Sequence, residues 1–256
     1  MNRYCAFDTE TTGIQPGSRM LEIAAQVFLE DGSVERQWAT LVNPGMPIPP
    51  DVVEINGITD EMVKDAPTAA QALEMFLAFA PADALLVAHN ASYDIGIIEW
   101  EAQRAGAVLP GFAFIDTCEM ARRAAKTKNA RLDTLVEHFA IERLGDSHRA
   151  LCDADAARQL YLRLRQAIQP WTTAWADAVK YHYAMELPEV IADLPALVAA
   201  GGDLSFAYED GKGDRSERTI VPYGWANTET GLMFHGLCKL RGERRTFRGD
   251  RVLARA

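Results

Sequence analysis

The chain reads Cys-Ala-Phe-Asp-Thr-Glu-Thr-Thr-Gly from residue 5 to residue 13. Alternate residues of a strand point to the same face, so Asp8 and Glu10 project together from the end of an apolar strand. Crowded carboxylates either share a proton or bind a cation, and hard divalent ions such as Mg²⁺ or Mn²⁺ take oxygen ligands of this kind. Gly13 allows a sharp turn after the strand. The stretch therefore predicts a buried strand with a candidate metal site at its end.

Further acids occur at two predicted helix starts. A short apolar strand leads into His89-Asn90-Ala91-Ser92-Tyr93-Asp94, which places Asp94 in the first turn of the next helix. The helix dipole favours an acid there, so Asp94 taken singly fits a structural role as well as a functional one. Farther along, His148 precedes Asp153 by five residues, with the histidine in a loop and the acid early in a long helix. A loop histidine can approach and leave a reacting group, as proton transfer requires.

The order of predicted elements indicates an α/β fold for the larger part of the chain. Three strands come first, with an Asp-Gly turn at residues 31–32 before the third, and Thr59 is expected to cap a helical stretch. Strands and helices then alternate, which predicts a mixed sheet with helices on its faces. The expected strands are 3–9, 20–29, 34–42, 84–88 and 112–115, and the expected helices are 60–80, 92–105, 117–125, 131–139 and 150–168.

Composition describes a globular chain of 256 residues, 48% hydrophobic and 24% charged. No run of 18 uncharged apolar residues is present, and the amino terminus carries a charge where a signal peptide would be apolar, so we expect a cytoplasmic protein without a membrane partner. The four cysteines form no Cys-x-x-Cys pair, and buried free thiols are expected. The net charge of −10 argues against a protein that coats long nucleic acids, although an enzyme acting on one strand end is compatible with it.

Together, residues 8–13, residues 89–94 and the pair His148 and Asp153 resemble, in order, the three motifs of the DEDDh branch of 3′→5′ exonucleases. This branch includes the proofreading epsilon subunit of DNA polymerase III and ribonuclease T. The similarity covers about residues 1–168. Residues 55–61 also resemble the loop that these enzymes place beside the terminal nucleotide, although many relatives carry histidine where this chain has Asn56.

The resemblance implies a ribonuclease H-like fold and two divalent ions, Mg²⁺ or Mn²⁺, held by carboxylates. Asp8, Glu10 and Asp153 would surround one ion, Asp8 would be shared with the second, and Asp94 would act largely through water. His148 would be the general base for in-line attack of water on phosphorus, which releases nucleoside 5′-monophosphates. The residues expected to contact the terminal nucleotide are Thr11, Thr12, Ile58 and Asn90. For the two threonines, an equally good interpretation is a turn after the strand.

Near residue 170 the pattern changes, which predicts an exonuclease domain over 1–170, a helical connector over 171–200 and a small β module over 201–256. Residues 217–252 resemble part of a WYL domain, a small β-barrel of nucleic-acid-responsive regulators. Where that family carries Trp-Tyr-Leu, this chain has Leu-Met-Phe at residues 232–234. Strands are expected over 204–208, 217–221, 232–240 and 244–248.

Two segments are locally basic. Residues 122–131 hold five basic residues and no acid, which fits either a strand contact or a solvated helix end and loop. Residues 239–256 hold seven basic residues against two acids, and arginines alternating with Phe247 could grip phosphates and stack on a base. The alternative is a solvated strand face that pairs with the acidic exonuclease domain.

The sequence therefore predicts an exonuclease acting on nucleic-acid 3′ ends, with single-stranded DNA as the first candidate substrate and a DNA polymerase or repair complex as a candidate partner. An exoribonuclease that trims RNA is the alternative enzyme, because the motifs do not read the sugar. A nucleic-acid sensor without catalysis is the alternative from another class. All five acid and histidine positions of the motifs are present, and a binding-only relative would be expected to lose at least one.

Overall fold

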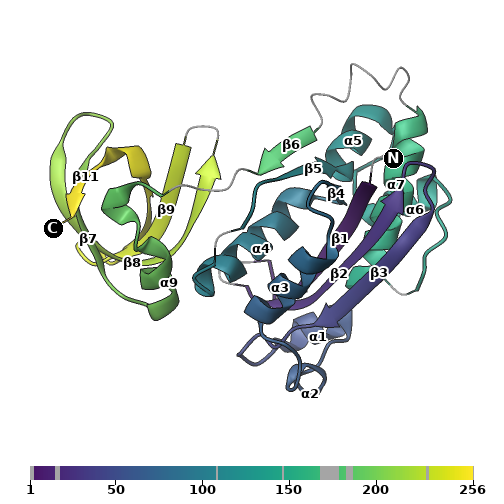
Figure 1. The fold of residues 1–256 in the computed structure, drawn as a ribbon, viewed down its shortest axis with the longest axis horizontal. Coiled ribbons are helices and arrows are strands. Elements are labelled where there is room, and N and C mark those ends of the chain that lie inside the picture. Colours follow the sequence, from purple (N-terminus) through teal and green to yellow (C-terminus); the bar gives the residue numbers. More distant parts are fainter. Residues whose placement is uncertain are drawn as a thin grey trace. The chain divides into compact units, whose positions relative to one another are not determined.

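The computed structural model describes residues 3–14, 18–107, 109–145, 147–167, 179–182, 187–228 and 231–255. The chain divides into two compact units, the first formed by residues 1–98 and 111–182 and the second by residues 99–110 and 183–256. We describe each unit by itself (Figure 1). Among the described helices, none has both the length and the apolar character that a membrane span needs.

The first unit is built on a six-stranded mixed sheet of order β3-β2-β1-β4-β5-β6. Neighbouring strands are antiparallel, except that β1, β4 and β5 run parallel. The strands are β1 (Arg3–Thr11), β2 (Met20–Leu29), β3 (Val34–Leu41), β4 (Leu85–Ala88), β5 (Phe112–Asp116) and β6 (Val179–His182). The predicted α/β architecture, a ribonuclease H-like mixed sheet flanked by helices, is confirmed.

The helices of this part of the chain are α1 (Pro50–Asn56), α2 (Asp60–Val63), α3 (Ala69–Phe79), α4 (Ala91–Arg104), α5 (Thr117–Ala124), α6 (Leu132–His138) and α7 (Ala150–Ala167), of which α3 and α7 pack on the sheet. Alternation along β1 sends Tyr4 toward α7, where its ring lies 5.4 Å from that of Tyr161. The next odd positions face the other way, and the ring of Phe7 lies 5.7 Å from Phe76 of α3. Asp8 and Glu10 continue the alternation of Tyr4 and therefore belong to the α7 face.

The helical stretch expected over residues 60–80 is two separate helices. Thr59 makes no side-chain hydrogen bond at the start of α2, so its expected capping role is wrong. Thr68 is the effective cap, because its hydroxyl accepts from the Gln71 backbone while the Gln71 side chain accepts from the Thr68 backbone. Pro67 directly precedes this cap and disfavours a continuous helix.

The second unit contains a five-stranded antiparallel sheet of order β10-β9-β8-β7-β11. Its elements are η2 (Glu189–Ile191), α9 (Leu194–Ala200), β7 (Leu204–Glu209), β8 (Arg215–Thr228), β9 (Gly231–Cys238), β10 (Glu243–Arg248), η3 (Gly249–Arg251) and β11 (Val252–Arg255). The expected β module is confirmed in kind. However, β8 extends well beyond the expected strand over 217–221, and β11 was not expected.

Two sequence-based expectations about this part of the chain are wrong. The connector over 171–200 is not wholly helical, because residues 179–182 form strand β6 and pair with β5, while 171–178 lie outside the described residues. Phe247 is buried among Phe206, Phe234 and Tyr208 instead of being free to stack on a base. An aromatic residue at an inward position of an edge strand is buried by the sheet's own core. The domain boundaries drawn from the sequence stay a prediction.

Ion pairs also reduce the positive character expected over residues 239–256. Of its seven basic side chains, four pair with nearby carboxylates: Lys239 with Asp203, Arg245 with Glu243, Arg248 with Asp250 and Arg255 with Asp193. Arg244 lies over the ring of Tyr223, 5.6 Å from its centroid. All four partner carboxylates belong to the second unit, so the alternative of a strand face that pairs with the exonuclease domain stays a prediction.

Candidate active site

Several polar residues of the site lie where the three parallel strands end. Glu10 lies one residue before the end of β1, Asn90 follows β4 by two residues, and Asp116 is the last residue of β5. The carboxyl ends of parallel strands meet at one edge of a sheet, so loops that follow them share a common space. The fold thus converts three separate stretches of sequence into one candidate site.

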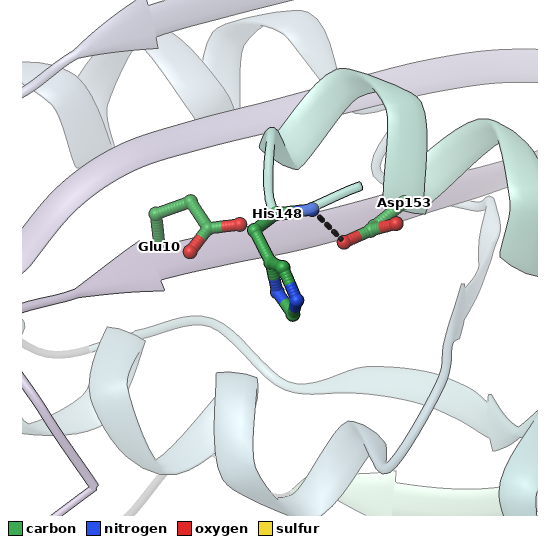
Figure 2. A group of neighbouring side chains, drawn as sticks. All are labelled: Glu10, His148 and Asp153. Atoms are coloured by element: carbon green, nitrogen blue, oxygen red, sulfur yellow. Dashed lines mark hydrogen bonds between the residues drawn. The ribbon is translucent and has the colours of Figure 1, made fainter. Parts of the chain in front are cut away.

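Glu10, His148 and Asp153 converge at this edge. Each offers a possible ligand atom, and these atoms all lie within 4.8 Å of one another. Figure 2 shows Glu10, from β1, and Asp153, from α7, on opposite sides of His148. The backbone N–H of His148 donates to Asp153 Oδ2 at 3.0 Å, and His148 adopts a left-handed φ of 61° on an exposed loop. The strained turn presents the imidazole beside both carboxylates.

Asp94, the next acid of the site, is buried. Its Oδ1 accepts from the backbone N–H of Thr9 at 3.0 Å and from the Thr9 hydroxyl at 2.7 Å. Burial raises the pKa of Asp94 to about 7, although the two Thr9 hydrogen bonds favour the charged form. Asp94 lies in the first turn of α4, as the sequence predicts.

The pKa values of Asp8 and Glu10 are also raised. Burial raises the pKa of Asp8 well above its usual range, and the negative charges of Asp94 and Asp153 raise it further. Burial, followed by the charges of Asp153 and Glu22, raises the pKa of Glu10 to about 8. Crowded carboxyl groups in a desolvated space resist joint ionisation unless a cation compensates them.

The residues present fit a divalent cation. Asp8, Glu10, Asp94 and Asp153 bring hard oxygen ligands into mutual electrostatic range, and burial raises the pKa values of Asp8, Glu10 and Asp94, as expected for crowded carboxyl groups without a compensating cation. Mg²⁺ and Mn²⁺ prefer such oxygen donors, and His148 adds a nitrogen at the rim. The arrangement is a candidate metal centre of the hydrolytic type.

Sequence reasoning missed Glu22, a buried carboxylate directly opposite Glu10 in the β1–β2 register. Glu22 accepts from Arg149 at 2.8 and 3.1 Å and from the backbone N–H of Ala150 at 3.0 Å. It thereby anchors the start of α7 beside the His148 loop. A signal was available, because Glu22 is the only charged residue in the apolar stretch of residues 20–29.

Arg143 was missed as well. Its guanidinium donates to Asp153 Oδ1 and also to Asp133, so both oxygens of Asp153 have partners in this structure. Gln159 supports the same loop by donating to the backbone carbonyl of Glu142 at 2.8 Å. No local sequence pattern predicts these contacts of Arg143, because Asp133 and Asp153 each lie ten residues away from it.

The four residues expected to contact substrate lie in different environments. Thr11 and Thr12 are buried, and their hydroxyls bond within the protein: Thr11 to Gly13 at 2.8 Å and to Tyr93, and Thr12 to the Arg19 backbone at 2.9 Å. These contacts favour the turn interpretation. Asn90 is exposed, with a φ of 65°.

Ile58 is fully buried, in a cluster with Leu21, Ile48, Val52 and Val63. Its side chain is therefore part of the packing of this region, and the expected direct contact with a nucleotide is not supported by its position. The buried Asn56 side chain, two residues earlier, lies near Glu10 and favours the charged form of that carboxyl. The same side chain accepts from the Ile58 backbone at 3.0 Å and so fixes the loop.

Comparison with known proteins gives this geometry a family. The RNase T family model, which describes exonucleases, matches residues 5–161. The chain belongs to this exonuclease family. A second model, that of the WYL domain, matches residues 189–255. The chain is therefore a nuclease hydrolase by family, and its second unit carries a WYL domain. The resemblance of the sequence to both families is confirmed.

Curated relatives of the exonuclease part include DNA polymerases. The DNA polymerase III PolC-type of Caldanaerobacter subterraneus subsp. tengcongensis is 36% identical over 168 residues, which are 65% of this chain and 12% of the relative. The protein of the same name from Halalkalibacterium halodurans is 38% identical over 165 residues, 64% of this chain and 11% of the relative. The chain thus matches only a small part of the length of either polymerase.

Solved structures agree with the fold. Exonuclease X in complex with 5′ overhanging duplex DNA superposes with a TM-score of 0.54 at 28% identity, covering 67% of this chain and 95% of that one. Escherichia coli Exonuclease I in complex with a dA16 oligonucleotide gives a TM-score of 0.58 at 18% identity, covering 93% and 55%. The second likeness is one of fold.

Proposed function

We propose that the chain is a 3′→5′ exonuclease of the histidine branch that removes nucleoside 5′-monophosphates from single-stranded DNA ends. The observation that carries the proposal is the convergence of Glu10, His148 and Asp153 beside the half-buried Asp8 and the buried Asp94. Family membership supports nuclease chemistry. The direction, the branch and the DNA substrate are part of the proposal.

Two divalent ions, Mg²⁺ or Mn²⁺, would be held by Asp8, Glu10, Asp94 and Asp153, and when bound they would supply Lewis-acid stabilisation of the charge on the phosphate. In this proposal His148 accepts the proton of the attacking water, since its exposed loop position allows it to meet solvent and substrate. Oxygen from water bonds to phosphorus, the bond from phosphorus to the 3′ oxygen breaks, and that oxygen takes up a proton. The products are a nucleoside 5′-monophosphate and a strand shortened by one nucleotide.

The protein supports this chemistry through contacts that fix the reacting groups. Thr9 orients Asp94 with two hydrogen bonds, and Glu22 anchors Arg149 and the start of α7. The left-handed turn at His148 is tied to Asp153 by the backbone hydrogen bond. Such fixed carboxylates lower the cost of assembling the charged site.

Release of mononucleotides tests the proposal. A 20-nucleotide single-stranded DNA and the RNA of the same sequence would each be labelled at the 5′ or the 3′ end and incubated with Mg²⁺, Mn²⁺ or EDTA. We expect metal-dependent release from the 3′ end that is lost in Asp8→Ala and His148→Ala but kept in His138→Ala, a change at another exposed histidine. Faster trimming of RNA than of DNA would indicate that RNA is the substrate. Binding without release under both metals would favour a non-catalytic sensor.

The identity of the relatives supports a second, separate proposal about partners, namely association with a DNA polymerase or repair complex. The relatives at 36% and 38% identity are themselves polymerases that include a matching segment. Co-purification of the tagged full chain with a replicative polymerase from the same cells would support this proposal, and failure to co-purify in the presence of DNA ends would contradict it.

A further inference from the structure

Residues 122–131 form a basic surface that the proposed chemistry does not use. Its five cationic side chains are all exposed: Arg122, Arg123, Lys126, Lys128 and Arg131. Within the described residues, none of the five has an ion pair or side-chain hydrogen bond, in contrast to the paired cations of the second unit. The segment contains no acid, in a chain whose net charge is −10. An uncompensated cluster of this kind favours a polyanion as its partner.

The ordinary role of basic residues at a helix end explains only part of the cluster. Arg122 and Arg123 lie in the last turn of α5, where cations complement the helix dipole. Lys126, Lys128 and Arg131 come after the helix has ended, so the dipole does not account for them. The Thr127 hydroxyl donates to Asn129, and the Asn129 side chain accepts from the Arg131 backbone, which gives this loop a defined shape.

The basic segment is joined to the candidate active site. His89 contacts the Ala130 carbonyl through Nε2 at 2.9 Å and the Thr117 hydroxyl through Nδ1 at 2.9 Å. Asp116, the cap of α5, accepts from the backbone N–H of Asn90 at 2.9 Å. The far end of the segment, at Ala130, and the start of α5, which leads into the segment, are therefore both bound to the turn that carries Asn90 and leads to Asp94.

We propose that residues 122–131 bind the phosphates of the strand that extends from the terminal nucleotide held in the active site. The inference rests on the proposed function and deepens it, because it assigns a surface to the nucleotides that are not being cleaved. Lysine and arginine neutralise backbone phosphates without reading bases, so DNA and RNA strands of equal length are bound alike by this surface. A strand of a few nucleotides would be too short to reach it.

The test uses two double variants. The cluster variant combines Lys126→Gln with Lys128→Gln, and the matched control combines Arg163→Gln with Lys212→Gln. Both double variants remove two exposed positive charges, and the control removes them from outside the cluster. Trimming of a 20-nucleotide and a 3-nucleotide DNA would be measured in 150 mM salt. We expect the KM for the long strand to rise about fivefold to tenfold only in the cluster variant, since two phosphate contacts are lost. The kcat for both strands and the KM for the short one should not change.

Salt dependence gives a second readout that needs no catalysis. Each phosphate contact to a single strand contributes about 0.7 to the slope of log affinity against log salt, so removing two contacts lowers the slope by about 1.4. Between 50 and 200 mM salt, the fold-decrease in affinity for the 20-nucleotide strand, measured in EDTA, would then be about sevenfold smaller for the variant than for the wild type. The inference would be overturned if the wild type trims normally and the cluster variant has the same KM and the same salt slope as the control. No trimming by the wild type would instead refute the proposed function, and the binding slope would still decide the surface.

Discussion

Replacing Glu10 with glutamine tests the electrostatic account of the candidate site directly. The pKa of Glu10 is raised from its ordinary 4.5 to about 8, first by burial and then by the charges of Asp153 and Glu22. The folded protein without metal therefore keeps a proton that the unfolded chain releases at a lower pH. Stability falls with pH wherever the folded state binds more protons, so the wild type should lose stability as pH rises from about 4.5 through about 8.

The magnitude follows from the shift. One pKa unit corresponds to about 1.4 kcal/mol, and the part of the shift that titrates between pH 5 and pH 7.5 amounts to about 3 kcal/mol. Glutamine has nearly the same shape and no titration in this range. The variant should therefore lose about 3 kcal/mol less than the wild type between these two pH values.

Urea denaturation in EDTA at pH 5 and pH 7.5 measures both free energies of unfolding. Glu137→Gln, which changes an exposed glutamate of α6, is the matched control and should keep the wild-type pH dependence. Adding Mg²⁺ at pH 7.5 should stabilise the wild type more than Glu10→Gln, because a ligand that binds only the folded state stabilises it. Equal pH dependence in the wild type and Glu10→Gln would refute the idea that uncompensated carboxyl charge destabilises the empty site.

Two further substitutions test contacts seen only in the structure. Arg149→Met leaves the buried Glu22 with the Ala150 backbone as its remaining partner, which should lower the unfolding free energy by about 2–3 kcal/mol and the Tm by about 5–10 °C. A Tm unchanged by calorimetry would contradict this role. Thr68→Ala removes the cap of α3 and should cost about 1 kcal/mol, whereas Thr59→Ala should cost almost nothing. Equal losses in chemical denaturation would show that the cap assignment is wrong.

Several features of the site followed from local sequence patterns. Alternation along a strand places Asp8 and Glu10 on one face, and β1 runs through both. Apolar runs followed by helix signals put Asp94 and Asp153 in the first turns of α4 and α7, and His148 in the loop before α7. These positions depend on a few neighbouring residues, which is why periodicity and motif order were sufficient to find them.

Partners distant in the chain were decided by the tertiary structure. Glu22 and Arg149 are 127 residues apart, and only the packing of α7 against β1 and β2 brings them together. Burial was decided in the same way: Ile58 and Phe247 belong to cores that form when separate segments meet.

The sequence by itself determined the fold class, the family and the order of the acidic motifs, because each is written in short stretches whose geometry is local. Only the tertiary structure decided what compensates each charge. It paired Asp153 with Arg143, left the five cations of residues 122–131 without ion pairs among the described residues, and paired Lys239 with Asp203 and Arg255 with Asp193. Charge compensation depends on distances across the folded molecule, and these are set when the sheet and its helices pack together.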